Sequence, residues 1–472
     1  MSKRTITRRD FIKLAGVSLG TTVLAACAPQ VVTQIVKETQ IVNQTQVVKE
    51  TQIVSQVITA TPLPTNPSPQ PLIFDSSQLN QVQEIDKVNT LILNPFTGAQ
   101  MQYVSETDSQ QIDRLTAEKK AGKYTIGVIG ALHGTFPNLL AIDVLEDLTP
   151  LATKLSDRGI NKGFMELGKL GTDQQYYLPW MQATYVMAVN KKALEYLPAG
   201  VDVNALTYTQ LADWGKAIAE GTNQKKVGLP AGPNGLMHRL TQGYLYPAYT
   251  GGLVTTYRSE EANTMWTDLK SIWQNCNPQS TSYNFMQDPL LTEEVWIGWD
   301  HTARLGTAFA QKPDDFIAVP APSGPKGLYY MSVLAGLGIP KNSPNQVGAE
   351  AFIDYMTTPA IQTITAVQLG FYPILDTGIP ENMPPSSKLI ADAVIAQAKA
   401  SNAHVSLLPI GLATRSGDFN KIMQDSFTRI VIKNEDIKAV LDDEATQMNV
   451  ILNDVKAACW LPDVGTGVCQ AQ

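Results

Sequence analysis

The chain has 472 residues, of which 44% are hydrophobic, and its formal net charge is -7. The chain is longer than a domain with a single hydrophobic core, so two globular lobes and some non-globular sequence are expected. Residues 1–26 contain five basic residues and one acidic residue, a net charge of +4, which leaves -11 for the rest. A body that acidic would repel phosphate, which argues against nucleic acid and against a polybasic membrane-binding surface.

The first 27 residues have the features of an export signal. Arg8, Arg9 and Phe11 form a twin-arginine motif, and an apolar run follows from residue 14 to residue 26. That run is shorter than the roughly 20 residues that a membrane-spanning helix needs. It ends in Leu-Ala-Ala-Cys, which resembles the lipobox of bacterial lipoproteins. We expect residues 1–26 to be a twin-arginine lipoprotein signal peptide and Cys27 to carry the lipid; a plain secretory signal with a chance cysteine is the alternative.

Residues 27–77 differ in composition from the rest of the chain. Residues 35–52 repeat an apolar pair and four polar residues with a period of six, and five prolines follow between residues 62 and 71. A period of six gives neither a helix nor a strand a continuous apolar face. We expect a flexible spacer between the lipid and the body, with a self-associating coil as the alternative.

Three cysteines remain besides Cys27: Cys276, Cys459 and Cys469. A lipid anchor would place them in an oxidising space outside the cytoplasmic membrane, where disulfides form. Cys459 and Cys469 flank a short loop with one proline and two glycines, so this pair is the expected disulfide. The alternative is that all three thiols are free.

From about residue 78, strand patterns alternate with amphipathic helix patterns, which is typical of α/β layers. A helix is predicted at residues 108–121, with Asp108 or Ser109 as its N-cap and Gly122 as its stop. Further helices are predicted at residues 138–145, 191–196, 209–220, 260–275, 347–357 and 361–369. Strands are predicted at residues 101–105, 124–129, 185–189, 316–319 and 333–339.

Several short blocks follow one another in a fixed order along this body. They are Asp-Val-Leu-Glu-Asp-Leu-Thr-Pro at 143–150, Tyr-Leu-Pro-Trp at 177–180, and the blocks at 185–191, 207–211, 316–327, 334–341, 349–369 and 370–373. Their order resembles the sugar-binding family of extracellular solute-binding proteins, which includes the maltose-binding protein. The resemblance covers most of residues 78–452. It implies an α/β, two-lobed fold of the type II periplasmic-binding-protein class, with crossing hinge strands and an interlobe cleft.

The resemblance also implies the division into lobes: lobe 1 at residues 78–183 and 333–372, and lobe 2 at residues 184–332 and 373–472. One segment departs from the family. A strand-like run at residues 90–93 lies only a few residues before the strand at 101–105, whereas a parallel crossover needs a dozen or more. Either the first helix lies upstream, near residues 79–87, or the edge of lobe 1 is rebuilt.

The family implies a substrate-binding protein of an ABC importer, which closes around a carbohydrate and passes it to the permease without catalysis, cofactor or metal. Sugar rings pack on aromatic faces, and their hydroxyls need paired donors and acceptors. Side chains of these kinds near the crossings and strand ends are the ligand-binding candidates, although each could also be packing: Trp180, Trp299, Asp300, His301, Arg304, Tyr329, Tyr330, Tyr372 and His133.

Two other functions stay open. The same fold could bind a polyamine, a peptide or a phosphorylated polyol, although Arg304 is the only cation that the sequence places in the cleft. The protein could also be a surface glycan-binding adhesin or a glycoside hydrolase. The four histidines show no zinc-ligand spacing, and neither Cys-x-x-Cys nor a phosphate-binding loop occurs, which disfavours an enzyme.

Overall fold

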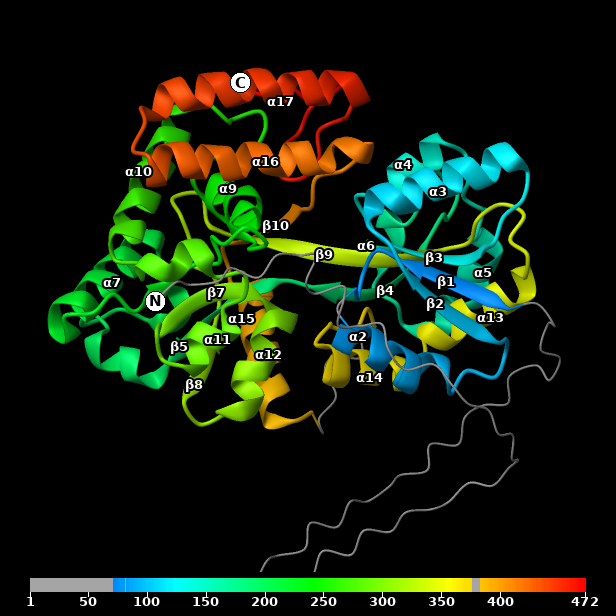
Figure 1. The fold of residues 1–472 in the computed structure, drawn as a ribbon, viewed down its shortest axis with the longest axis horizontal. Coiled ribbons are helices and arrows are strands. Elements are labelled where there is room, and N and C mark those ends of the chain that lie inside the picture. The colour runs from blue at the N-terminus through cyan, green and yellow to red at the C-terminus, as the bar shows by residue number, and fades with distance from the viewer. Residues whose placement is uncertain (1–70, 81, 376–382) are drawn as a thin grey trace, which may run out of the picture. The chain divides into compact units, whose positions relative to one another are not determined.

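The structure is a computed structural model, and its description covers residues 71–80, 82–375 and 383–472 (Figure 1). The expected signal peptide, Cys27 and nearly all of the expected spacer lie outside these residues. Within them, no helix combines the length and the apolar character that crossing a bilayer requires.

A six-stranded sheet forms the core of lobe 1 and extends into lobe 2 through the first half of β9 and β10. Its strands are β1 (Leu72–Ser76), β2 (Met101–Ser105), β3 (Ile126–Leu132), β4 (Leu178–Ala183), β9 (Leu328–Gly338) and β10 (Ala403–Leu407). The order is β10-β9-β3-β1-β2, with β4 also pairing with β9. β1 runs parallel to β2 and β3, whereas β9 runs antiparallel to β3 and β4. The carboxyl ends of β1, β2 and β3 therefore share one edge.

The start of the body corrects two predictions. Leu72–Ser76 lies within the expected spacer, yet it forms β1, because Leu72 and Phe74 are buried between the layers while the backbone pairs with strands on both sides. Residues 90–93 are not a strand. They belong to the helical segment α2 (Val82–Lys87) and η1 (Val88–Leu93), whose apolar residues are spaced to bury one face. The first helix thus lies upstream of β2, which was one of the two alternatives.

Helix α3 (Asp108–Ala121) has the predicted bounds and covers one face of this sheet (Figure 1). Its N-cap is Thr107 and neither of the two predicted residues, Asp108 or Ser109, because Thr107 and Gln110 form a reciprocal capping box. Gly122 ends the helix with φ of 65°, a left-handed conformation that favours glycine. On the opposite face, Phe352 of α13 (Gln346–Met356) packs against Phe74.

Lobe 2 contains a four-stranded sheet in the order β6-β7-β5-β8. The strands are β5 (Tyr185–Asn190), β6 (Val227–Gly228), β7 (Ile297–His301) and β8 (Phe316–Val319). β7 runs antiparallel to β5 and parallel to β6. The longer helices of this lobe are α7 (Tyr208–Thr222), α10 (Glu260–Gln274), α12 (Thr302–Gln311), α15 (Pro385–Lys399), α16 (Ser416–Phe427) and α17 (Ile437–Val455).

Short helical segments complete the described elements. The α-helical ones are α4 (Phe136–Ala141), α5 (Thr149–Lys154), α6 (Lys162–Leu167), α8 (Met237–Leu240), α9 (Tyr246–Thr250), α11 (Gln287–Leu291) and α14 (Pro359–Ile364). The π-helical ones are η5 (Thr241–Leu245), η7 (Thr365–Leu369) and η9 (Thr428–Ile432). The 3-10 turns are η2 (Ser156–Arg158), η3 (Lys191–Tyr196), η4 (Val203–Ala205), η6 (Pro278–Ser282) and η8 (Ala413–Arg415).

Three segments connect the lobes, as the two-lobed fold class predicts. β4 continues through Thr184 directly into β5, and β9 runs from lobe 2 into lobe 1 (Figure 1). The third crossing pairs with the first, because Gln182 and Tyr372 exchange backbone hydrogen bonds of 3.1 and 2.7 Å. The proposed boundary between residues 332 and 333 falls inside β9, where its pairing with β10 ends and its pairing with β4 begins.

The C-terminal tail follows α17, which lies alongside α16 (Figure 1). A disulfide joins Cys459 to Cys469, the pairing that the sequence suggested, while Cys276 is a buried free thiol. Asp463, within the closed loop, accepts backbone hydrogen bonds from Leu253 and Val254 at 2.9 and 3.0 Å. The tail is thereby held against lobe 2.

Candidate functional site

The carboxyl ends of the central strands bring polar groups toward the junction of the lobes. β1 and β3 of lobe 1 end at Ser76 and just before His133, and β7 of lobe 2 ends at His301. Ligands of open α/β sheets bind outside the carboxyl ends of the strands, where loops and helix N-termini offer unpaired polar groups. The candidate site is therefore built from these ends and the segments beside them.

The lobe 2 side of the site is organised around Tyr185, the first residue of β5. Trp299 stacks on Tyr185 with a centroid distance of 4.6 Å and an interplanar angle of 4°. Tyr244 packs edge-on against both rings, and its hydroxyl accepts the backbone N–H of Tyr185 at 3.0 Å. Both stacked rings are buried, since Trp299 is fully enclosed and Tyr185 is 3% exposed. Sequence reasoning assigned Tyr185 to a strand and missed its place here.

Asp300 is fully buried and holds the local backbone. One carboxylate oxygen accepts the N–H of Met286 at 2.9 Å, and the other accepts the N–H of His301 at 2.8 Å. Burial raises the pKa of Asp300 to about 6, although the Arg304 guanidinium and these two N–H groups lower it. In this conformation Asp300 fixes the end of β7, which carries His301.

His301 directly precedes α12, and Arg304 lies in the first turn of that helix. His301 Nδ1 accepts the N–H of Ala303 at 3.3 Å and so caps the helix. Burial, and to a smaller extent the charge of Arg304, lowers the pKa of His301 to about 3, so the ring is neutral at physiological pH. Arg304 donates to the carbonyl of Asn284 at 3.1 Å and lies over the Phe285 ring, 4.4 Å from its centroid.

Helix α8 adds two basic residues that the sequence analysis missed. The half-buried Arg239 donates to Gln242 Oε1 at 2.9 Å, and Gln242 donates to Asn420 Oδ1 at 3.0 Å. His238 is buried, and its Nδ1 has no hydrogen-bond partner among the described residues. Burial holds the pKa of His238 well below its usual value, and the guanidinium groups of Arg239 and Arg304 lower it further.

On the lobe 1 side, His133 follows β3 and pairs with Tyr177, with 2.8 Å between Nδ1 and the hydroxyl oxygen. Burial lowers the pKa of His133 to about 4. The chain beyond β10 touches this corner, because the N–H of Gly411 donates to the carbonyl of Gly134 at 3.3 Å. A segment that follows a lobe 2 helix thus contacts the loop after β3.

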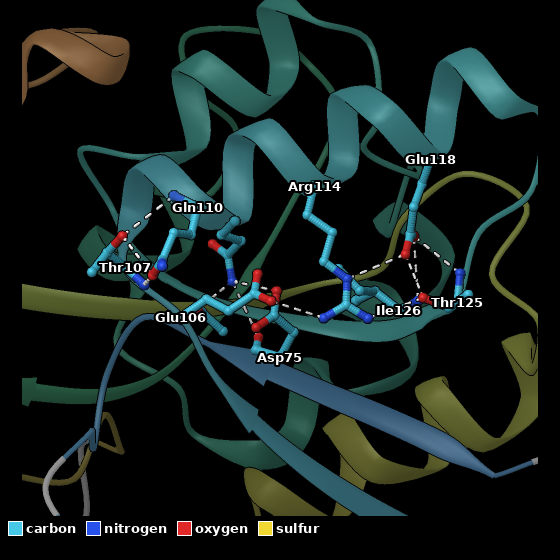
Figure 2. A network of polar contacts seen from close by, with 10 residues as sticks. Asp75, Glu106, Thr107, Gln110, Arg114, Glu118, Thr125 and Ile126 are labelled. Carbon is cyan, nitrogen blue, oxygen red and sulfur yellow. Dashed lines mark hydrogen bonds and ion pairs between the residues drawn. The ribbon is translucent and has the colours of Figure 1, made fainter. Parts of the chain in front are cut away.

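A network of acidic groups lies where β1, β2 and α3 meet (Figure 2). Asp75 is fully buried, and one of its oxygens accepts from Gln111 Nε2 at 3.3 Å while the other has no partner among the described groups. Arg114 donates to Glu106 at 3.0 Å and to Glu118 at 3.3 Å (Figure 2). Burial, reinforced by the charge of Glu106, raises the pKa of Asp75 to about 7.

Besides a hollow of about 380 Å³ beside Lys87, α12 and Tyr372, two more lie at the junction of the lobes. The first, which we call the hinge cavity, has a volume of about 350 Å³ and is lined by parts of all three crossings, including Gln182, Tyr330 and Tyr372. The second, which we call the interlobe groove, has a volume of about 140 Å³ and lies between Lys87 of α2 and Arg304 of α12. The hinge cavity is mostly aliphatic, whereas charged and amide side chains line the groove.

The remaining sequence candidates are placed as follows. Trp180 is fully buried on β4 and packs edge-on against Phe74, in the core of lobe 1. Tyr329 stacks on His404 of β10 with 4.8 Å between the ring centroids. The structure therefore brings Trp299, Asp300, His301 and Arg304 together, and it places Trp180 and Tyr329 apart from that cluster. Among the described residues, no group of three or more His, Cys, Asp or Glu side chains could hold a metal ion.

Comparison with known proteins agrees with this architecture. The sequence profile of a family described as "Bacterial extracellular solute-binding protein" matches residues 84–363. No curated protein sequence matches the chain. Among solved structures, similar folds include the GacH receptor of Streptomyces glaucescens, studied unliganded and with acarbose (15% identity, 82% of this chain and 99% of that one, TM-score 0.64).

Two further structures have the same fold. The sugar-binding protein MalE of Xanthomonas citri has 14% identity over 82% of this chain and 98% of its own, with a TM-score of 0.65. UgpB of Mycobacterium tuberculosis, in complex with glycerophosphocholine, has 16% identity over 82% of this chain and 99% of its own, with a TM-score of 0.64. These likenesses confirm the two-lobed fold of the type II binding proteins.

Proposed function

Because the chain belongs to the bacterial extracellular solute-binding protein family, we propose that it is the substrate-binding lipoprotein of an ABC importer and binds a carbohydrate between its lobes. The observation that carries this proposal is the cluster around Tyr185, where an aromatic ring, neutral histidines and guanidinium groups meet at the strand ends. Such a mixture suits sugar rings, whose faces are apolar and whose edges carry hydroxyls.

The similar structures support a sugar without deciding it. GacH was studied with acarbose and MalE is described as sugar-binding, but UgpB holds glycerophosphocholine in the same fold. At 14–16% sequence identity the likeness supports a shared fold only. The solute is determined by the side chains of this chain's own site. A phosphorylated polyol is therefore the main rival to a plain carbohydrate.

The binding cycle follows from the three crossings. A solute that touches both lobes binds the closed arrangement more tightly than the open one, so binding shifts the population toward closure. We propose that β4, β9 and the segment at Tyr372 bend during this movement, and that the permease subunits recognise the closed form. His133 of lobe 1 and the cluster of Tyr185, His301 and Arg304 in lobe 2 would then contact the solute from opposite sides.

The cellular place of this cycle rests on the family and on the N-terminal motifs. The family description places the protein outside the cytoplasm. We propose that a lipid on Cys27 holds it at the outer face of the cytoplasmic membrane, with residues 28–71 as a spacer. Labelling of the expressed protein with a radioactive fatty acid should mark the wild type and leave Cys27→Ser unmarked; equal labelling of both would refute the anchor.

A thermal-shift screen tests the function. The mature chain carrying Cys27→Ser is heated with monosaccharides, oligosaccharides, polyols, polyamines and peptides. We expect a sugar to raise the melting temperature and to be recovered unchanged afterwards. Stabilisation by a polyamine or a peptide, with none by any sugar, would refute the carbohydrate assignment. Steady hydrolysis of a chromogenic glycoside would instead indicate an enzyme.

A further inference from the structure

The base of the hinge cavity is one face of the crossing strands. Tyr330 and Ser332 of β9 line the cavity, and so do Val405 and Leu407 of β10, with which they pair. Because alternate residues of a strand point to the same face of a sheet, these four side chains form one continuous surface. Gln182 of β4, the strand that pairs with the other half of β9, extends this surface toward lobe 1. The cavity therefore lies directly on the strands that join the lobes.

The walls of the cavity come from both lobes. Phe164 and Leu167 of α6 line it from lobe 1, and Val394 and Ile395 of α15 line it from lobe 2. Two of the lining side chains, Ile395 and Val405, are 36% and 40% exposed, so the cavity is open to solvent and a molecule can enter it. A molecule inside it would contact α6 and α15 together.

The crossing strand β9 separates this cavity from the cluster around Tyr185. Met331 lies between two residues of β9 that face the cavity, so its side chain points to the opposite face. There it meets η5, since a Cβ added to Gly243 would lie 2.5 Å from Met331 Cε. Tyr244, the next residue of η5, packs on Tyr185. The hinge cavity and the candidate solute site thus lie on opposite faces of one strand.

The lining of the cavity disfavours a charged ligand. None of the described residues that line it has a charged side chain. An ion held there would lose its hydration without gaining an opposite charge, which is strongly unfavourable. Most of the lining is aliphatic or aromatic, and the volume of about 350 Å³ lies at the lower end of the range of small-molecule sites, roughly 300–1,000 Å³. The cavity therefore suits a small, uncharged and largely apolar molecule.

A few polar groups give the cavity a hydrogen-bonding side. Tyr330 and Tyr372 line it, and neither hydroxyl has a hydrogen bond to a described residue; burial alone acts on the pKa of each and raises it. Gln182 donates its amide to the Pro373 carbonyl at 3.1 Å, which leaves its side-chain oxygen as an acceptor. Tyr372 also lines the hollow beside α12, so Tyr330 is the hydroxyl that tests the hinge cavity most specifically.

We propose that the hinge cavity is a second binding site, which takes a small uncharged molecule with an apolar body and one hydroxyl or carbonyl group. The apolar body packs against α6 and α15, and the polar group bonds to the Tyr330 hydroxyl or to the Gln182 side chain. The site goes beyond the proposed function, because it does not depend on which solute binds between the lobes. A molecule that contacts both walls would also hold α6 and α15 at one separation.

Four probes of similar size test the ligand class. The mature chain carrying Cys27→Ser is titrated at pH 7 with benzyl alcohol, toluene, benzoate and benzylamine, and binding is followed by the methyl resonances of its Ile, Leu and Val residues. We expect the resonances of Val394, Ile395 and Leu407 to shift. Benzyl alcohol should bind about fivefold more tightly than toluene, because it adds a hydrogen bond. It should bind more than about tenfold more tightly than the two charged probes.

Variants assign the binding to the cavity. Tyr330→Phe should remove the preference for benzyl alcohol over toluene and leave the binding of toluene as it is. Ala398→Trp, at an exposed residue of the lining on α15, should fill the space and abolish the shifts caused by either probe. Ala396→Trp is the matched control, because Ala396 is exposed on the same helix and does not line the cavity; it should bind as the wild type does.

Three results would overturn the inference. The first is benzoate or benzylamine binding as tightly as benzyl alcohol, and the second is binding that Ala398→Trp leaves unchanged and that the solute with the largest thermal shift displaces. The third is a dimer in sedimentation equilibrium that Ala398→Trp dissociates, since a second copy would then cover the cavity. None of these results bears on the carbohydrate proposal, which the sugar screen tests separately.

Discussion

Asp75 should make the stability of the body fall as the pH rises. Its pKa is raised from 3.8 to about 7, chiefly by burial and then by the charge of Glu106 (Figure 2). Between these two pH values the folded protein holds a proton that the unfolded chain has lost. The stabilising effect of that proton is fully present below about pH 4, and it is lost as the pH rises through about 7.

The magnitude follows from the size of the shift. The folded and unfolded pKa values differ by about 3, and each pKa unit corresponds to about 1.4 kcal/mol, so the whole effect is about 4 kcal/mol. Between pH 5 and pH 8 only the part from pH 5 to about 7 counts, which is about 3 kcal/mol. The buried histidines act in the opposite direction. His133 and His301 have lowered pKa values, so the folded protein becomes less stable as the pH falls below about 6.5 and the unfolded chain binds protons.

A substitution isolates the Asp75 contribution from the histidines. Asp75→Asn keeps the shape of the side chain and cannot ionise, and its amide can donate to Glu106 Oε2, which is buried without a partner among the described atoms. Urea denaturation gives the unfolding free energy of wild type and Asp75→Asn at pH 5 and at pH 8. The difference, wild type minus variant, should be about 3 kcal/mol smaller at pH 8 than at pH 5. Asp113→Asn, on the exposed side of α3, is the control. Identical pH dependence in wild type and Asp75→Asn would refute the reasoning.

Three further changes probe the site and the tail. Trp299→Ala should cost about 3–5 kcal/mol of stability and weaken solute binding, because Tyr185 loses the ring that it stacks on; calorimetry that finds unchanged affinity would show that Trp299 only packs. Gly134→Ala would put its Cβ 2.4 Å from the Pro409 carbonyl oxygen, so it should destabilise by about 1–3 kcal/mol, whereas Gly417→Ala in an open part of α16 should not; equal denaturation midpoints for these two variants would contradict the close approach. Cys459→Ser should cost about 2–3 kcal/mol by freeing a loop of 10 residues, and no loss in urea denaturation would mean that the disulfide does not constrain the chain.

The sequence predicted the regular parts of the fold well because their signals are local. The helix at residues 108–121 shows its apolar spacing, its capping residues and its terminal glycine within a single window. β1 was missed for the opposite reason. Leu72–Ser76 is a short run directly after the proline-rich segment, and only its pairing with β2 and β3 makes it a strand. The local sequence of a strand does not reveal which distant segments it pairs with.

The site was harder to predict because burial and partners decide it. Trp180 and Trp299 are aromatic residues near crossings, and the structure places both indoles in the interior. Arg239 had no signal, since its helix of four residues resembles any short turn. Residues 299–304 end a strand and begin a helix, and their contact with a solute stays a prediction.

The central claim is that two lobes close around a solute that is released unchanged. Small-angle X-ray scattering of the mature chain carrying Cys27→Ser, with and without the solute that raises its melting temperature most, tests this directly. Closure predicts a smaller radius of gyration at saturation, reversed when dialysis removes the intact solute. An unchanged radius of gyration at saturation, or a solute recovered chemically altered, would contradict the account.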